Sequence, residues 1–152
     1  MTKSIYLCLV CMFFSSVSFA TDDEITLFDQ SGESVIYIDL DDDLAIYIWE
    51  GHATAYLDGS LNQFLRGETL DVYGWNGKHL GWYFDGIIMN HNGDASCVTR
   101  ERHPGPVTEY VKYVKYVQYV KYVSYVAPVE PIFSNHFGEP DCLTLISSGR
   151  VD

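Results

Sequence analysis

Basic side chains are scarce in the first two thirds of this 152-residue sequence. Residues 21–99 carry fifteen acidic side chains and only two basic ones, Arg66 and Lys78, which gives a net charge of −13. Residues 100–152 carry six side chains of each sign. Nucleic acid binds to basic faces because its backbone is a chain of phosphates, so the acidic body argues against a nucleic-acid partner.

Motifs of familiar catalytic centres are also missing. The sequence has no G-x-S-x-G, no H-E-x-x-H and no glycine-rich phosphate loop that opens a helix. We therefore predict no catalytic residue, no metal ligand and no cofactor, and we favour a protein without enzymatic activity. The alternative is a small enzyme or metal-dependent binder. That alternative requires a pocket where polar turn residues such as His52, His79, Asp85 and His91 converge.

One acidic segment imitates a calcium loop. Asp39, Asp41, Asp43 and Glu50 have the spacing of the carboxylates in an EF-hand. Leu44 stands where that loop requires glycine, and the residues that follow are typical of a strand. We therefore interpret the segment as an acidic connection between two strands.

Only the N-terminus contains a long apolar run. Lys3 gives a short positive start, an apolar run extends to Phe14, and Ser18-Phe19-Ala20 forms a small-x-small site. These features predict a signal peptide over residues 1–20, so we expect an exported protein, either periplasmic or extracellular. The run is shorter than the roughly 20 residues that a membrane-spanning helix needs, and we expect no membrane span after the leader is removed. The alternative is an uncleaved anchor.

Cysteines are few. Two of the four, Cys8 and Cys11, lie in the leader, which leaves Cys97 and Cys142. An oxidising compartment favours a bond between such a pair, so we predict one disulfide, with two free thiols as the alternative.

The sequence does contain a fourfold repeat, centred on Gly32, Gly51, Gly77 and Gly93. Four residues before these glycines stand Phe28, Tyr47, Tyr73 and Met89, and five residues after them stand Tyr37, Tyr56, Trp82 and Val98. Apolar runs rich in β-branched and aromatic residues on both sides of a glycine turn are typical of β-hairpins. We therefore predict an all-β fold of four consecutive hairpins. Its core would be the rings of Phe28, Tyr37, Tyr47, Tyr56, Tyr73 and Trp82, packed around a shared axis.

The hairpin pattern is interrupted once, by LNQFLRGETL at residues 61–70. We expect a loop or an added turn of strand there. If the chain is a structural or recognition module, its rings should be mostly buried and its hairpin turns should extend into solvent.

The motifs GKHLGWY at residues 77–83, DGII at 85–88 and NHNGD at 90–94 resemble the 4-fold beta flower family. The resemblance covers residues 25–100. It implies a small all-β domain of four hairpin-like units around a pseudo-fourfold axis. No activity is established for that family, so the resemblance carries over no catalytic residue. A low-complexity triplet tail after the domain is also similar to relatives, which usually have proline where this chain has tyrosine.

Residues 110–126 read YVKYVKYVQYVKYVSYV, six Tyr-Val pairs with a period of three. A helix would wind the tyrosines around its whole surface, and a strand would alternate them between two faces. Polyproline II has three residues per turn and would give separate tyrosine, valine and polar edges, whereas the composition favours a strand. Both conformations remain open for this extended arm.

The arm lies between a linker, residues 101–109, and a C-terminal tail, residues 127–152. One hypothesis is that it mediates self-association or binds a protein partner, with its three lysines docked on the acidic body of its own chain or a neighbour. The alternative is that it only links the two ends. We predict an exported module with a structural or protein-recognition role, whose partner the sequence does not name.

Overall fold

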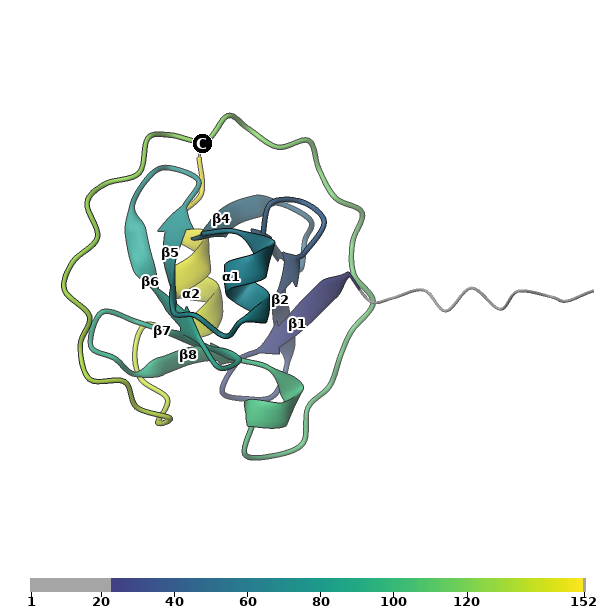
Figure 1. Ribbon diagram of the computed structural model, residues 1–152. Helices are drawn as coiled ribbons and strands as arrows, with labels where there is room; N and C mark the ends of the chain where they lie inside the picture. Colours follow the sequence, from purple (N-terminus) through teal and green to yellow (C-terminus); the bar gives the residue numbers. More distant parts are fainter. Residues whose placement is uncertain (1–22, 152) are drawn as a thin grey trace, which may run out of the picture.

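The computed structural model describes residues 23–151, which form a closed barrel of eight antiparallel strands in chain order (Figure 1). The strands are β1 (Glu24–Phe28), β2 (Ser34–Asp39), β3 (Ala45–Ile48), β4 (Ala53–Asp58), β5 (Leu70–Gly74), β6 (His79–Phe84), β7 (Ile87–Met89) and β8 (Ala95–Val98). The predicted all-β fold of four consecutive hairpins is confirmed. The signal peptide predicted over residues 1–20 lies outside the described residues.

The four hairpins share one backbone irregularity. In each, the register shifts just before the large residue that precedes the turn: at Leu27/Phe28, Ile46/Tyr47, Val72/Tyr73 and Ile88/Met89. The pairings between hairpins show no such shift. A bulge bends a strand and increases its twist. Four equivalent bulges therefore curve the sheet in four equivalent places, which is how one repeated sequence closes into a barrel.

Mainly aliphatic side chains fill the centre of the barrel. The largest buried cluster includes Leu27, Ile36, Ile38, Ile46, Leu57, Val72 and Ile88. Successive strand residues point to opposite faces, so Ile36 and Ile38 point inward while Tyr37 points outward. The prediction that the rings pack around a shared axis is wrong. The rings of Phe28, Tyr37, Tyr47, Tyr56, Tyr73 and Trp82 are buried outside the central cluster. An eight-stranded barrel has a narrow interior, which is filled here by inward branched aliphatic side chains and by a helical plug.

The plug is the C-terminal helix α2 (Cys142–Ser147), which lies inside the ring of strands (Figure 1). The Asp141 carboxylate caps its start by accepting a hydrogen bond from the amide of Thr144 at 2.8 Å. Cys142, Leu145 and Ile146 are buried in the central cluster. The predicted disulfide between Cys97 of β8 and Cys142 is present and ties the plug to the barrel wall.

Two further short helical segments connect or follow the strands of the barrel. The insertion at residues 61–70 contains helix α1 (Leu61–Leu65), so the expectation of a loop or an added turn of strand is wrong. The side chains of Ser60 and Gln63 form a capping box, which stabilises the start of this helix. A 3-10 helix, η1 (Arg100–Arg102), follows β8. No helix within residues 23–151 is both long and apolar enough to cross a membrane.

Candidate functional site: a belt docked on an aromatic face

Residues 106–134, here called the belt, run around the outside of the barrel (Figure 1). The belt includes the whole Tyr-Val arm, and residues 109–134 are neither helix nor strand. It also includes the end of the predicted linker and the start of the predicted tail. The arm is therefore docked along its length on its own barrel.

The belt meets each repeat glycine in the same way. A Cβ atom built on Gly32, Gly51, Gly77 or Gly93 would lie 2.2–2.3 Å from the carbonyl oxygens of Pro106, Val114, Val123 and Ile132, respectively. Two residues further on, the belt amide donates a hydrogen bond to the carbonyl of that glycine. These donors are Thr108 (2.7 Å), Tyr116 (2.9 Å), Tyr125 (2.9 Å) and Ser134 (2.8 Å). Glycine is therefore required at each turn for two reasons. Its φ of 83–101° is positive, and the belt backbone approaches too closely to leave room for a side chain.

The contacts recur every eight or nine residues along the belt, and nine residues are three triplets. A chain with three residues per turn therefore presents the same edge at successive hairpins. The valines of the arm are 85–95% exposed, its tyrosines are 51–68% exposed, and its polar residues contact the barrel. These are the three edges that polyproline II predicts, and the two-sided alternation of a strand is not observed.

Aromatic donors from the barrel hold the belt backbone. The indole N–H of Trp49 donates to the carbonyl of Val111 at 3.2 Å, and that of Trp75 donates to the carbonyl of Tyr119 at 2.5 Å. The hydroxyl of Tyr73 donates to the carbonyl of Tyr125 at 2.7 Å. Polyproline II has no internal hydrogen bonds, so its carbonyls are free to accept such bonds, as they do in aromatic-lined peptide-binding domains.

Lysines of the belt lie over the rings of the barrel. The Lys112 ammonium is 4.5 Å from the centre of the Tyr37 ring, and that of Lys121 is 4.2 Å from the Tyr56 ring and 4.9 Å from Trp75. A cation over an aromatic face is attracted by the negative charge density of the ring. The repeat rings thus form the docking face of the belt.

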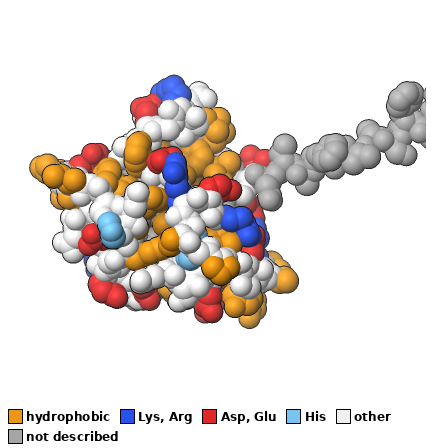
Figure 2. Space-filling model, turned by 90° about the horizontal axis from the view of Figure 1, so that it is seen from below, with side chains coloured by type: hydrophobic (Ala, Val, Ile, Leu, Met, Phe, Trp, Pro, Cys, Tyr) orange, Lys and Arg blue, Asp and Glu red, His pale blue; other side chains and the backbone are white. Residues whose placement is uncertain are grey.

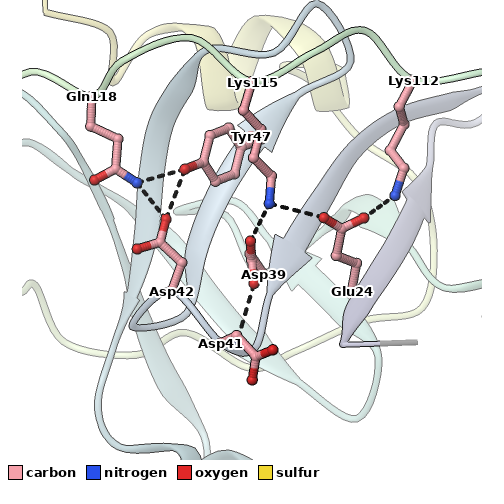
Figure 3. Close-up of polar contacts among 8 residues, drawn as sticks. All are labelled: Glu24, Asp39, Asp41, Asp42, Tyr47, Lys112, Lys115 and Gln118. Atoms are coloured by element: carbon pink, nitrogen blue, oxygen red, sulfur yellow. Dashed lines mark hydrogen bonds and ion pairs between the residues drawn. The ribbon is translucent and has the colours of Figure 1, made fainter. Parts of the chain in front are cut away.

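Two lysines of the belt also make ion pairs with acidic residues of the barrel (Figure 3). Lys112 pairs with Glu24, and Lys115 pairs with both Glu24 and Asp39. Burial alone would raise the pKa of Glu24, but hydrogen bonds from the two lysines outweigh it and lower that pKa. Burial would lower the pKa of Lys115, but Asp39 and Glu24 raise it instead. Both shifts favour the charged forms that hold the belt in place.

The acidic segment that imitates a calcium loop contributes to this docking. Asp39 binds Lys115, and Asp42 accepts hydrogen bonds from Gln118 and from the hydroxyl of Tyr47. Within residues 23–151 no three His, Cys, Asp or Glu side chains are arranged to hold a metal ion. Two carboxylates of the segment are instead partners of belt side chains.

The four polar turn residues of the enzyme or metal alternative do not converge. His79 and His91 meet, with 2.9 Å between Nδ1 and Nε2, and Nε2 of His79 lies 2.8 Å from Asp71. His52 instead stacks on Tyr116 of the belt, with 4.2 Å between ring centres, and Asp85 pairs with Arg102. Burial, with a smaller contribution from His79, lowers the pKa of His91.

The expectation that the hairpin turns extend into solvent holds for turn residues such as Ser31, Glu50, Lys78 and Asn92, which are exposed, but not for the glycines. All four repeat glycines are buried, because the belt covers them. The sequence displayed both halves of this contact, the glycines and the triplets. The signal that could have linked the triplets to the glycines is that a period of three suits belt contacts eight or nine residues apart. The uneven spacing of the glycines in the sequence hides this signal.

The fold defines the structural class of this protein, which is a barrel of four bulged hairpins surrounded by an extended belt. A family model described as 4-fold beta flower protein matches residues 25–146, and the chain belongs to that family. The matched region covers the strands, the belt and most of α2, and so extends well past residue 100. No curated protein and no solved structure matches the chain.

Proposed function

We propose that this protein is an exported structural module that binds further copies of itself through the valine ridge of its belt. The ridge consists of Val111, Val114, Val117, Val120, Val123 and Val126. The observation that carries the proposal is the 85–95% exposure of all six side chains. Six exposed valines on one segment exceed the single scattered apolar residues that are normal on a protein surface, and such exposure marks protein-interaction sites.

The ridge is the part of the surface on which two copies can meet with the least charge repulsion. The whole chain has a formal net charge of −12, so two copies repel each other over most of their surface. Figure 2 shows acidic side chains spread over one face of the molecule beside a few basic ones. The valine ridge carries no charge of its own, and Lys112 and Lys115 beside it already pair with Glu24 and Asp39. Two ridges can therefore meet without bringing like charges into contact.

Export is supported by the leader-like residues 1–20 and by the Cys97–Cys142 disulfide, which an oxidising compartment favours. The mass of the protein recovered from the periplasm or the medium tests this part. A mass lacking residues 1–20 is expected. The full-length mass, or retention of the chain in the cytoplasm, would contradict it.

Sedimentation equilibrium tests the assembly itself. The wild type should self-associate with rising concentration, and more strongly at higher salt, because salt screens the repulsion between acidic copies. The V117D/V120D variant should stay monomeric, because it places charges on the ridge. The exposed apolar residue Leu65 on α1 provides the control L65D, which should associate like the wild type. A wild type that is monomeric at every concentration, or one that both variants leave equally associated, would overturn the proposal.

A further inference from the structure

The barrel closes at one incompletely paired seam. β1 and β8 are in register at a single residue pair, Phe28 and Val98. Every other pair of neighbouring strands is in register over at least three residue pairs. The edge of β1 before Phe28, residues Glu24–Leu27, therefore has no strand partner on its β8 side within the described chain. An open strand edge offers backbone donors and acceptors to an added strand.

A cavity of about 430 Å³ lies along this edge. It is lined by Ile25, Thr26 and Phe28 of β1, by the start of η1 and by belt residue Glu109. The volume is near the lower end of the range for ligand sites, roughly 300–1,000 Å³. Four residues of open edge span about 13 Å at roughly 3.3 Å per residue, which suits a peptide segment of three or four residues.

The charges that face the cavity favour a cation. Glu24, Glu101 and Glu109 line it together with one basic residue, Arg100. Glu24 is occupied by belt lysines, whereas Glu101 has no ion pair within residues 23–151. An anionic ligand would meet repulsion here, and a lysine or arginine would find a free carboxylate.

The cavity already accommodates one guanidinium. The Arg100 side chain lies over the Phe28 ring, 5.3 Å from its centre, and donates to Glu109 at 3.2 Å. Glu109 also accepts a hydrogen bond from the Thr26 hydroxyl at 2.7 Å, which holds this carboxylate beside β1. An aromatic ring and carboxylates in this arrangement hold a cation by cation–π attraction and charge.

We propose that this seam binds a short extended peptide carrying lysine or arginine, which adds as a strand to the free edge of β1 and pairs its cation with Glu101. Recognition of this kind takes affinity from main-chain hydrogen bonds and specificity from side-chain sites beside the strand. The proposal is independent of the valine ridge, which lies on the outward surface of the belt.

Titration of the exported protein with three capped peptides, followed by NMR of the backbone amides, tests the proposal. Val-Lys-Val-Lys-Val should shift the amides of Ile25, Thr26 and Glu101. Val-Glu-Val-Glu-Val should not bind. The lysine peptide with N-methylated backbone should bind at least about tenfold more weakly, because it keeps the charge but lacks strand donors.

Two charge reversals locate the site. E101K should weaken binding of the lysine peptide by about tenfold or more, because it places a cation beside the ligand cation. E130K makes the same charge change at an exposed position near the other end of the belt and should leave the affinity unchanged. Shifts that spare β1, equal affinity for E101K and E130K, equal binding of lysine and glutamate peptides, or no binding at millimolar peptide would each overturn the proposal. The amide spectrum of each variant also shows whether it remains folded.

Discussion

The inner and outer faces of the same eight strands are held by different chemistry. Inside, branched aliphatic side chains surround an apolar helix that a disulfide fixes to the wall. Outside, tyrosine and tryptophan rings hold an extended belt through hydrogen bonds and lysine–ring contacts, and acidic side chains add ion pairs. The alternation of strand side chains lets one repeated hairpin serve both faces, with every second residue assigned to each. Positions that are aromatic in most of the repeats can therefore lie on the outer face of the barrel and not in its inner core.

Removing the disulfide tests the inner face and should have the largest effect. C97S/C142S opens a loop whose ends are 45 residues apart in sequence, which should lower the free energy of unfolding by about 4 kcal/mol. Urea unfolding of the variant and of the wild type measures the difference. Reduction of the wild type should reproduce it, and equal stability of oxidised and reduced protein would contradict the role of the plug.

Replacing one repeat glycine tests the outer face. G77A places a Cβ in a residue with φ of 85° and 2.3 Å from the Val123 carbonyl oxygen. The control G67A has a φ of 74° with nothing within 4 Å of the new Cβ. The left-handed backbone should cost about 1–2 kcal/mol in both variants, and the belt collision roughly 1–3 kcal/mol more in G77A. Equal losses in urea unfolding would show that the belt does not press on this turn.

Removing one belt charge should have the smallest effect. K121M removes the ammonium that lies over the rings of Tyr56 and Trp75 but keeps most of the apolar stem. The expected loss is about 0.5–1 kcal/mol, the usual size of an exposed cation–π contact. K78M removes a lysine from the exposed third turn and should change stability less. A K78M variant as destabilised as K121M would rule out a specific lysine–ring contribution.

The fourfold repeat could be predicted because its signals are local. Gly77 follows asparagine, and Tyr73 and Trp82 flank the turn at the offsets seen in the other hairpins. The repeat also marks the bulges, since each register shift falls immediately before the residue that is equivalent to Tyr73 in its hairpin. The pairing of Cys97 with Cys142 could also be predicted, because only two cysteines follow residue 20.

The same patterns could not predict whether each repeated position lies on the inner or the outer face of the barrel. Ile36 and Tyr37 are both apolar, so alternation alone does not say which one faces the axis. Helix α2 has six residues, too few for a helical period to stand out from its surroundings. The docking of Lys112 and Lys115 on the acidic body was one of several open hypotheses, because charge complementarity does not distinguish a chain's own surface from that of a neighbour.

Amide hydrogen exchange of the belt tests the central claim most directly. The amides of Tyr113, Tyr116, Tyr122 and Tyr125 donate to barrel carbonyls, whereas the valine amides of the arm find no acceptor within residues 23–151. A docked belt predicts slow exchange at these tyrosines and fast exchange at the valines between them. Exchange at every belt amide at the rate of an unfolded peptide would show that the belt does not encircle the barrel in solution.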